Sequence, residues 1–511
     1  MMASEHRPAG LHLSHLLADI GYTDPSADPV IGGLTLDSRQ VEAGWLFLAC
    51  RGRATHGLDH VQQAVRHQAV AVVCEPGADW SMERIARLRG KLPIPLVVVP
   101  QLRPHVGRMA ARFYGDPSRA LSVAGITGTN GKTSCSHFLA QAQLPRCGIV
   151  GTLGVGFPGA LRPTGHTTPD AVTLQRALAT MRAEGATAVA MEVSSHALDQ
   201  GRVNGVHFDV AVLTNLSRDH LDYHGDMAAY GAAKRLLFEM EGLGCAVINS
   251  DEAFGREIAT GLDPSLFVVL YGLELPPIPV DRVVQWVHGA AIEHHAGGMR
   301  IQVESSWGCG EIDSRLFGDF NARNLLAVLS VLLYRGMALE QALARLGEVT
   351  TVPGRMELFR AEGRPSVIVD YAHTPDALEQ VLKALRPHCK GRLVTVFGCG
   401  GERDAGKRPL MGHVAERYSD RVILTDDNPR NEDGEWIIGE ILNGVEQSEN
   451  IVVERKRAEA IRVAIETAER DDLILVAGKG HEEVQSIGDL ELPFSDREAV
   501  ATLLGLKGSA S

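Results

Sequence analysis

The sequence predicts an α/β fold in which helices cover parallel sheets. Short apolar runs alternate with helical patterns from about residue 118, and a second alternation of this kind begins near residue 353. Strands buried on both faces are apolar along their whole length, as in a parallel sheet between two helix layers. The first runs end at Thr127, Glu192, Asn215 and Asn249, and the later ones precede Asp370, Gly398, Asp426 and Gly478. Polar motifs begin at these strand ends, where ligands of open parallel sheets bind.

Breaks in the pattern predict three domains. Residues 1–115 form a small amino-terminal α/β domain, residues 116–350 a central domain, and residues 351–511 a carboxyl-terminal domain. The pair Pro353–Gly354 is the strongest break between the second and third domains. A chain of 511 residues is long enough for several domains of ordinary size.

Individual elements follow from local patterns. We expect strands at residues 46–49, 69–73 and 96–99, each an apolar run in the first domain. Residues 265–317 are less regular and contain a period-two stretch, which favours an antiparallel addition to the central sheet. Residues 322–346 are predicted to be helical.

Net charge and cysteine content argue against several classes of protein. The net charge of −13 argues against non-specific nucleic-acid binding. The eight cysteines include no CxxC pair, which favours a reducing compartment over a disulfide scaffold or a zinc site. No secretory signal is visible, and the longest apolar stretch, near Leu325–Tyr334, is too short to span a membrane. We expect a monomeric cytoplasmic protein whose partners are small molecules, with no nucleic acid and no membrane among them.

A glycine loop at residues 125–134, GITGTNGKTS, predicts binding of a nucleoside triphosphate. An apolar run precedes the loop, backbone N–H groups can approach the phosphates, Lys132 neutralises charge, and the Thr133 hydroxyl can hold Mg²⁺. Five residues separate Gly125 from Gly131, one more than in the usual phosphate loop. A tight strand–helix turn without nucleotide is the alternative. The predicted ATP-binding residues of the loop are Gly128, Thr129, Asn130, Gly131, Lys132, Thr133 and Ser134.

Two further segments of the central domain carry candidate metal ligands. Glu192 follows a buried strand and is placed either to bind Mg²⁺ or to favour a helix N-terminus. Residues 214–226 contain His220 and His224 among three aspartates. Zinc is one interpretation, but carboxylates dominate and a second set of ligands is missing, so Mg²⁺ or a solvated loop fits better. Spacing alone makes Lys234 a surface lysine on a helix.

The carboxyl-terminal domain presents charged loops after its apolar runs. Asp370 and His373 stand at one strand end, and residues 397–409 form a glycine loop with Arg403, Lys407 and Arg408, which predicts an anion site. Pro429 stiffens the turn before Arg430, whose guanidinium can grip a carboxylate with two hydrogen bonds. Gly478, Lys479, Glu482 and Glu483 follow the last run. Opposed acids and arginines suit the zwitterion of an amino acid, and solvated turns are the alternative.

These motifs resemble the Mur ligase family, the ATP-dependent enzymes that build the peptide of bacterial cell-wall precursors. The matching segments span nearly the whole chain in order: GTNGKT (128–133), MEVSSHAL (191–198), NLSRDHLDYHGD (215–226), GDFNARNLLA (318–327), PGRME (353–357), DYAHTPDAL (370–378), GCGGERD (398–404), DDNPR (426–430), AGKGHE (477–482) and FSDRE (494–498). The resemblance implies an amino-terminal domain for a UDP moiety, a central P-loop ATPase domain with a parallel sheet, and a Rossmann-like carboxyl-terminal domain.

The resemblance also implies roles for single residues. Mg²⁺ would be held by Thr133, Glu192, His220 and a carbamate on Lys234, which reverses the interpretation of Lys234 from spacing. Lys132, Glu192, His220 and Lys234 would be catalytic. Nucleotide contacts are implied for Asn321, Arg355, Asp370 and His373. Contacts with the UDP-linked substrate are implied for Leu36, Ser38, Thr167, Thr168, Ser194, Gln200 and Arg202, but not for His166, where relatives often carry asparagine. Contacts with the incoming amino acid are implied for Arg403, Asp427, Asn428, Pro429, Arg430, Gly478 and Glu482.

The implied reaction is ATP-dependent amide formation with Mg²⁺ as cofactor. ATP would phosphorylate the D-glutamate γ-carboxylate of a UDP-N-acetylmuramoyl dipeptide, and an amine would then displace phosphate from the acyl phosphate. We expect meso-2,6-diaminopimelate as the amine, because lysine lacks the second carboxylate that Arg430 can pair. The alternatives are the same reaction with L-lysine, a folate polyglutamate ligase, and a nucleotide-regulated binding protein without synthetase activity.

Overall fold

The computed structural model describes residues 10–18, 20, 27–52, 55–77, 79–143, 145–274, 283–295 and 298–506. The chain divides into two compact units, each built from separate segments. The first comprises Met1–Gly125, Gln143–Ala211 and Leu236–Gly244, and the second Ile126–Ala142, Val212–Arg235 and Cys245–Ser511. Strands β7 (Ser122–Thr127) and β12 (Val210–Leu213) cross the boundary between them. The boundaries of the three domains therefore stay a prediction.

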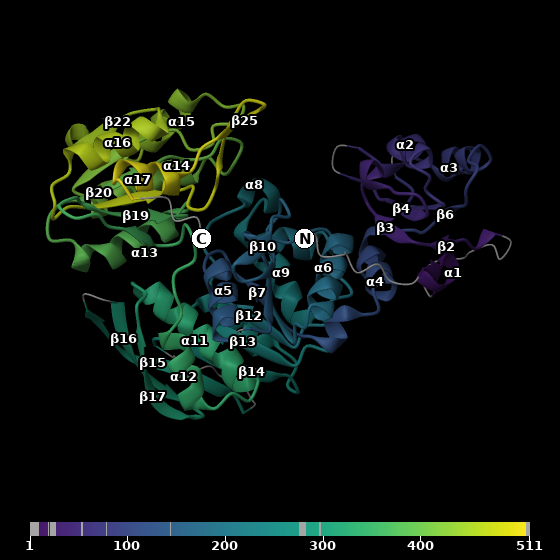
Figure 1. Cartoon of the computed structure of the whole chain (residues 1–511), viewed down its shortest axis with the longest axis horizontal. Coiled ribbons are helices and arrows are strands. Elements are labelled where there is room, and N and C mark those ends of the chain that lie inside the picture. The colour runs from purple at the N-terminus through teal and green to yellow at the C-terminus, as the bar shows by residue number, and fades with distance from the viewer. Residues whose placement is uncertain are drawn as a thin grey trace. The chain divides into compact units, whose positions relative to one another are not determined.

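A small parallel sheet forms the amino-terminal part of the first unit. Its strand order is β3-β4-β5-β6, with bounds Gly33–Thr35, Trp45–Ala49, Ala71–Cys74 and Leu96–Val98 (Figure 1). Leu46 and Leu48 of β4 belong to one hydrophobic core, and Phe47 and Ala49 belong to another. Successive side chains of a strand point to opposite faces, so two covered faces require an unbroken apolar run. The strands expected near residues 46–49, 69–73 and 96–99 are confirmed.

Short helices and a two-stranded sheet complete this region. The helices are α1 (Leu13–Leu16), α2 (Val61–Arg66), α3 (Met82–Arg89) and α4 (Arg103–Phe113), and β1 (Leu11–His12) pairs with β2 (Val30–Ile31). None of the helices in the described ranges is long and apolar enough to cross a bilayer.

The remainder of the first unit pairs β8 (Cys147–Gly151) in parallel with β11 (Ala188–Glu192), and β8 also begins an antiparallel meander through β9 (Gly154–Phe157) and β10 (Ala160–Arg162). Helix α6 (Ala171–Ala183) starts at Asp170, whose carboxylate accepts hydrogen bonds from the N–H groups of Val172 and Thr173. Helix α7 (Ser195–Asp199) follows β11 directly. Glu192 is therefore the last residue of a buried strand.

Strand β7 ends in the second unit and leads there through the glycine loop into α5 (Lys132–Ala142). Gly125 lies inside β7, so it belongs to the strand and not to the loop. Sequence analysis counted the glycine loop from Gly125, but its glycines with positive φ are Gly128 and Gly131, at 150° and 85°. Packing requires a glycine at position 125, because a Cβ there would lie 2.7 Å from the ring of Phe208 in the same unit.

The rest of the central region contains parallel and antiparallel strands. Strands β13 (Cys245–Asn249), β14 (Phe267–Gly272) and β15 (Gln285–His295) pair in parallel, and β15, β16 (Gly298–Ser305) and β17 (Gly308–Ser314) pair antiparallel. The antiparallel addition is thus confirmed for β15–β17, while β14 continues the parallel sheet. The helices are α8 (Leu221–His224), α9 (Met227–Arg235), α10 (Ala253–Gly261), α11 (Asp319–Tyr334) and α12 (Leu339–Gly347). The predicted helix at 322–346 is therefore two helices.

The carboxyl-terminal part is a doubly wound sheet with strand order β18-β19-β23-β20-β21-β22 (Figure 1). The strands are Glu357–Phe359, Ser366–Asp370, Leu473–Ala477, Leu393–Phe397, Arg421–Leu424 and Ile451–Val453, and only β18 among them pairs antiparallel. One face packs on α13 (Pro375–Leu385), α14 (Lys407–Tyr418) and α15 (Gly434–Leu442). The other face packs on α16 (Arg457–Thr467) and α17 (Asp496–Leu503). A hairpin of β24 (Val484–Ile487) and β25 (Leu490–Pro493) stands beside the sheet.

Candidate active site

The glycine loop folds tightly around its own lysine. A Cβ at Gly128 would overlap the Thr214 hydroxyl, and one at Gly131 would lie 2.6 Å from Asn324 Oδ1, so larger residues are excluded at both positions. The Lys132 ammonium donates to the carbonyls of Gly128 at 2.7 Å and Thr129 at 2.8 Å. The charge of Lys132 is therefore held over the loop, at the start of α5, where anions are favoured.

Residues after β12 hold the loop in place. The Asn215 carbonyl accepts from the Thr129 N–H at 3.0 Å, and Asn215 Oδ1 accepts from the Asn130 N–H at 2.9 Å. The Thr214 hydroxyl donates to the Asn130 carbonyl at 2.6 Å. Residues 214–226 contain the histidines and aspartates considered above as metal ligands. The first two residues of this segment, Thr214 and Asn215, hold the glycine loop in place.

A cavity of about 480 Å³ opens beside the loop. Six predicted nucleotide-binding residues line it: Asn130, Gly131, Ser134, Asn321, Arg355 and Asp370. The remaining predicted nucleotide contacts, which include Lys132, Thr133 and His373, are not among its lining residues. Sequence analysis missed Asp251 and Arg323, which also line the cavity and form an ion pair at 2.9 Å. The apolar run ending at Asn249 was the available signal, because Asp251 follows it by two residues.

Asp370 organises the turn that carries Arg355. Its carboxylate accepts from the N–H groups of Met356 and Ala372, both at 2.7 Å, and Met356 adopts a left-handed φ of 49°. Burial raises the pKa of Asp370, and the Arg355 charge opposes this shift. The Arg355 guanidinium lies 4.2 Å from the Tyr371 ring centre and donates to the Thr133 hydroxyl at 3.3 Å. Asp370 therefore shapes the cavity beside the glycine loop.

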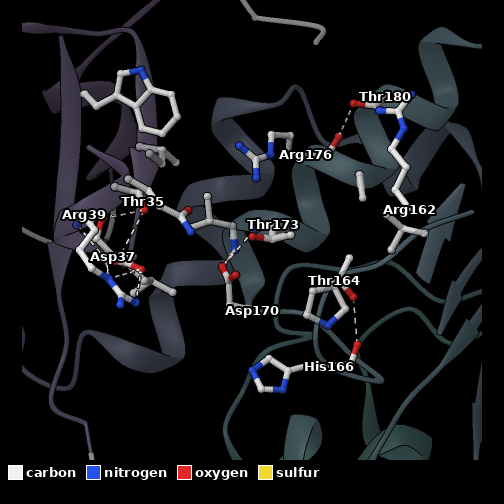
Figure 2. Close-up of a pocket in the computed structure, with 18 of the residues that line it drawn as sticks. Thr35, Asp37, Arg39, Arg162, Thr164, His166, Asp170, Thr173, Arg176 and Thr180 are labelled. Atoms are coloured by element: carbon white, nitrogen blue, oxygen red, sulfur yellow. Dashed lines mark hydrogen bonds and ion pairs between the residues drawn. The ribbon is translucent and has the colours of Figure 1, made fainter. Parts of the chain in front are cut away.

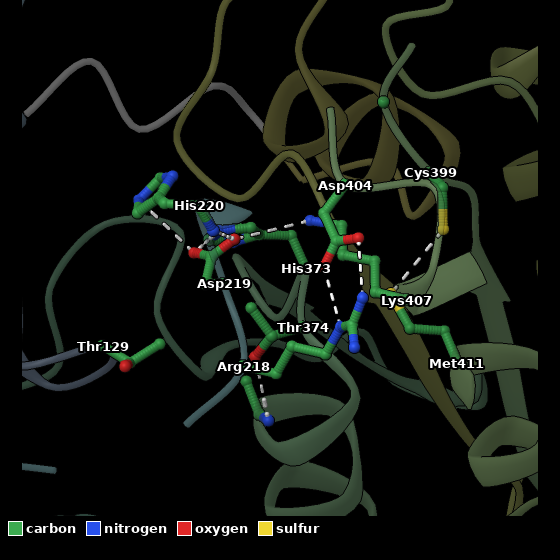
Figure 3. A network of polar contacts seen from close by, with 12 residues as sticks. Thr129, Arg218, Asp219, His220, His373, Thr374, Cys399, Asp404, Lys407 and Met411 are labelled. Atoms are coloured by element: carbon green, nitrogen blue, oxygen red, sulfur yellow. Dashed lines mark hydrogen bonds and ion pairs between the residues drawn. The ribbon is translucent and has the colours of Figure 1, made fainter. Parts of the chain in front are cut away.

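Asp219 is the centre of a polar network in the second unit that joins the loop after β12, the loop after β19 and helix α14 (Figure 3). Its carboxylate lies 3.4 Å from His220 Nε2, 3.6 Å from His373 Nε2 and 3.9 Å from Lys407 Nζ. Burial would raise the pKa of Asp219, but the His373 hydrogen bond and the nearby positive charges hold it well below its ordinary value. The neighbouring Arg218 pairs with Asp404 through two hydrogen bonds at 2.9 and 3.0 Å. A charged aspartate therefore links the loop after β12 to the carboxyl-terminal sheet.

Lys234 is buried on α9, with 1% of its surface exposed. The interpretation of Lys234 as a surface lysine was wrong, because α9 packs this side of the helix inward. The ammonium lies 4.2 Å from the Tyr230 ring centre. Burial lowers the pKa of Lys234 well below its ordinary value, and the positive charge of Lys132 lowers it further, while Asp219 opposes the shift. A lowered pKa favours the uncharged form of the amine, which is the form that reacts with CO₂.

His137, on α5, gives a pH dependence that can be measured. Burial, followed by the charge of Arg355, lowers its pKa to about 4 from an ordinary value of 6.5. The folded protein then binds this proton more weakly than the unfolded chain does. Stability is fully present above pH 6.5 and falls as the pH drops toward 4, by roughly 3 kcal/mol in total.

We expect His137→Leu to reduce the loss of stability between pH 7.5 and pH 5, as measured by urea unfolding at each pH. His67→Leu is the matched control, because His67 is exposed and its removal should leave the acid loss as in wild type. Equal acid losses in wild type and His137→Leu would contradict the assignment.

In the first unit, Glu192 and five predicted substrate-binding residues share one hydrogen-bond network. Glu192 is fully buried, and its carboxylate accepts from the Thr152 N–H at 2.9 Å and the Thr152 hydroxyl at 3.1 Å. The Thr152 hydroxyl also contacts that of Thr167 at 3.1 Å. Thr168, Ser194, Gln200 and Arg202 extend the network from the Glu192 carbonyl. Sequence analysis missed Thr152, because nothing in its local sequence distinguishes it from an ordinary turn residue.

A second cavity, of about 1170 Å³, lies in the same unit (Figure 2). Leu36 and Ser38, for which contacts with a UDP-linked substrate were predicted, line it, and His166, to which no role was given, also lines it. Figure 2 shows Arg39 beside Asp37 on one side and Arg176 on α6. Arg39 pairs with Asp37 at 2.8 Å, and Arg162 lies 3.9 Å from Glu184. Arg176 has no carboxylate partner within the described ranges, so its charge is available to a ligand.

The predicted amino-acid-binding residues gather at the carboxyl ends of β20, β21 and β23. A Cβ at Gly400 would lie 3.1 Å from Arg430 Nη1 and 3.7 Å from Arg403 Cγ, so both arginines border the same glycine. The Arg430 guanidinium donates to the Gly401 carbonyl at 2.6 Å. A Cβ at Gly478 would lie 2.6 Å from an Asp427 carboxylate oxygen.

Asn428, in the turn after β21, contacts both Lys479 and Glu482, which follow β23. Asn428 donates to Glu482 at 2.9 Å and accepts from the Lys479 ammonium at 2.9 Å, and Lys479 also pairs with Glu482 at 2.8 Å. Glu482 therefore carries a carboxylate that is already oriented by a buried lysine. Sequence analysis named Lys479 in this motif but did not assign it this orienting role.

Arg408 does not serve as an anion-binding residue, which corrects the interpretation of residues 397–409. Its guanidinium is buried between Glu432 at 2.9 Å and Glu440 at 2.5 Å. The two carboxylates satisfy its charge and tie α14 to α15. Arg403 remains exposed in the same loop.

No cluster of three or more His, Cys, Asp or Glu side chains able to hold a metal occurs in the part of the chain that the structure describes. The predicted Mg²⁺ ligands in the second unit are of a different kind: the Thr133 hydroxyl, His220, and a carbamate that only a modified Lys234 would supply. The oxygen atoms of a hydroxyl and a carbamate suit Mg²⁺, and the lowered pKa of the buried Lys234 favours formation of the carbamate.

Comparison with known proteins places this geometry in a family. Family models match residues 126–332 (Mur ligase middle domain), 354–480 (Mur ligase, glutamate ligase domain) and 30–114 (Mur ligase family, catalytic domain). A UDP-N-acetylmuramoyl-L-alanyl-D-glutamate–2,6-diaminopimelate ligase of Alkalilimnicola ehrlichii is 50% identical over 487 residues, which are 94% of this chain and 96% of that protein. The ligase of the same name from Coxiella burnetii is 48% identical over 492 residues, 96% of this chain and 98% of that protein. A solved structure of an enzyme with this name is 35% identical, has a TM-score of 0.66, and matches 97% of this chain and 99% of its own.

Proposed function

The chain belongs to the Mur ligase family, and we propose that it joins 2,6-diaminopimelate to UDP-N-acetylmuramoyl-L-alanyl-D-glutamate in peptidoglycan precursor synthesis. The observation that carries this proposal is the arginine-bearing turn at Asp427–Arg430, beside the oriented carboxylate of Glu482. It offers complementary charges to both ends of a diamino diacid. The near-full-length likeness to ligases of that name favours diaminopimelate over lysine and over a folate.

The reaction proceeds by activation of a carboxylate. The D-glutamate γ-carboxylate attacks the γ-phosphorus of ATP, so that ADP leaves and an acyl phosphate forms. The free amine of diaminopimelate attacks the acyl carbon, the C–O bond to phosphate breaks, and the amine loses a proton. Lys132 and the N–H groups of the loop stabilise the charge that moves from the γ-phosphate to ADP. ATP is the co-substrate.

The nucleotide would occupy the cavity beside the glycine loop. Arg355 and Asp370 line it, and so does Asn321, which lies on α11. In the second unit, Thr133, His220 and carbamoylated Lys234 would hold Mg²⁺, whose charge would offset that of the triphosphate. Glu192, in the first unit, stays a predicted Mg²⁺ ligand. Asp219, which lies beside His220 and is held ionised, would orient that ring through the 3.4 Å contact.

The UDP-linked substrate would bind in the first unit. Leu36 and Ser38 would contact the uridine end in the larger cavity. We assign the diphosphate to Arg176, whose guanidinium lines this cavity without a carboxylate partner in the described residues. Thr167, Thr168, Ser194, Gln200 and Arg202 would contact the sugar and dipeptide.

We further propose that the protein acts as a monomer in the cytoplasm, on small molecules and not on nucleic acid. All eight cysteines are free thiols, which suits a reducing compartment. The overall negative charge repels nucleic acid.

The proposal is tested by measuring ADP release with UDP-N-acetylmuramoyl-L-alanyl-D-glutamate and a panel of amino acids. We expect release that requires both the UDP-dipeptide and meso-diaminopimelate, with L-lysine at least tenfold less efficient, because it leaves a guanidinium without its carboxylate. Equal turnover with lysine, or release with a folate and glutamate, would replace this function by another.

Arg430→Ala should raise KM for diaminopimelate by about 10²-fold and leave KM for ATP within about twofold of wild type. The reason is the loss of a two-pronged contact with one substrate carboxylate, worth roughly 1.5–3 kcal/mol for a charged hydrogen bond. Steady-state kinetics with each substrate varied in turn measures both constants. Arg417→Ala, on helix α14 and outside the predicted site, is the control, and a parallel rise in both KM values would point to general unfolding.

A further inference from the structure

The β24–β25 hairpin is bound directly to the turn that carries Arg430. The Arg430 N–H donates to the Ser486 carbonyl at 3.0 Å, and the Gly488 N–H donates to the Arg430 carbonyl at 2.7 Å. The Ser486 N–H donates to Asn428 Oδ1 at 3.0 Å. The β-bridge between Arg430 and Ile487 is therefore one of several backbone contacts between the turn and the hairpin.

A single side chain of the hairpin completes this contact. Gln485 Nε2 donates to the carbonyl of Asp426 at 3.2 Å and to that of Asp427 at 2.8 Å. Gln485 is half-buried, whereas its neighbour Val484 and the whole of β25 are exposed. The amide thus points from an otherwise exposed hairpin onto the backbone at the start of the turn.

The turn requires such support because its backbone is strained. Arg430 has a φ of 52°, a left-handed conformation that a residue with a long side chain rarely adopts. Pro429 has no N–H with which to stabilise the turn from within. The backbone hydrogen bonds of Arg430 go to the hairpin, at Ser486 and Gly488, and from this position its guanidinium donates to the Gly401 carbonyl.

The same turn orients the residues proposed to receive the amine. Asn428 accepts from the Ser486 N–H and also contacts Lys479 and Glu482. A displacement of the hairpin would therefore move the positions proposed for both ends of the amino acid. The nucleotide cavity includes no residue of the hairpin among those that line it.

We propose that Gln485 is a positioning residue for the amino-acid substrate, which locks the β24–β25 hairpin onto the Asp427–Arg430 turn and so sets the affinity for diaminopimelate. The identity of the substrate in this inference rests on the proposed function. The hydrogen bonds that link Gln485 to the turn do not depend on it. Gln485 touches backbone carbonyls and acts through Arg430 and Asn428.

Kinetics test the consequence for substrate binding. Gln485→Ala should raise KM for diaminopimelate about tenfold and reduce the preference for diaminopimelate over lysine, with KM for ATP and for the UDP-dipeptide within about twofold of wild type. Gln485→Glu should be impaired further, because a carboxylate cannot donate to two carbonyls and is repelled by them. Glu491→Ala is the control, since Glu491 is exposed on the opposite strand of the same hairpin and should behave as wild type.

Hydrogen exchange tests the link without any substrate. The amides of Arg430 and Gly488 should exchange at least tenfold faster in Gln485→Ala than in wild type or Glu491→Ala, while amides of the sheet strand β23 remain protected. Unchanged exchange at Arg430 would overturn the proposal, and so would faster exchange with an unchanged KM for diaminopimelate. If wild type shows no diaminopimelate-dependent ADP release, the proposed function fails, and the exchange rates alone decide whether Gln485 holds the turn.

Discussion

Replacement of Lys234 by methionine is expected to lower kcat about 10³-fold without lowering the melting temperature. A charged amine is costly inside a protein, and burial already holds the pKa of Lys234 far below its ordinary value. This cost to stability is largest at low pH and shrinks as the pH rises toward 10.5, where the unfolded lysine also loses its proton. Methionine removes the cost and fills similar space, so a loss of activity would not reflect unfolding.

The chemistry of this residue can be observed directly. The uncharged amine attacks CO₂, an N–C bond forms, and one proton is released, which leaves a carbamate. With ¹³C-labelled bicarbonate, wild type should show a carbamate carbon signal that is absent in Lys234→Met. Lys390→Ala is the control, because Lys390 is exposed and its loss should preserve the signal. A fully active Lys234→Met enzyme would contradict the role.

The strands were predictable because a strand that is buried on both faces is an unbroken apolar run in the sequence. The apolar runs before Asp370, Gly398, Asp426 and Gly478 are confirmed as β19, β20, β21 and β23. The α/β class, the membership of the Mur ligase family and the ligase function are confirmed by the comparisons. The roles of individual site residues stay predictions, although the structure brings many of them together.

What the sequence could not supply depends on tertiary contacts. Lys234 reads as an exposed helix residue, and only the packing of α9 shows that it is buried. Arg408 and Arg403 follow the same glycine loop, yet Arg408 pairs with two carboxylates more than twenty residues away in sequence. Gln485 stands in a short polar alternation, and its acceptors are backbone carbonyls, which have no sequence signature.

Lys132→Ala is the other change with a large expected effect: we expect kcat to fall by at least 10³-fold and KM for ATP to rise. The ammonium donates to the carbonyls of Gly128 and Thr129, so its loss removes a positive charge from the glycine loop and leaves both carbonyls without this donor. ADP release under single-turnover conditions measures the chemical step. Calorimetric binding of the UDP-dipeptide provides the control, because its proposed site uses none of these atoms.

The two lysines should also be coupled. The positive charge of Lys132 lowers the pKa of Lys234 and would pair electrostatically with a carbamate there. In Lys132→Ala, the Lys234 amine is more readily protonated, and its carbamate loses a stabilising cation. Both effects act in the same direction, so the ¹³C carbamate signal should weaken in Lys132→Ala even though Lys234 is intact. A signal of full strength would show that the two residues act independently, and the loss of activity in Lys132→Ala would then reflect the triphosphate alone.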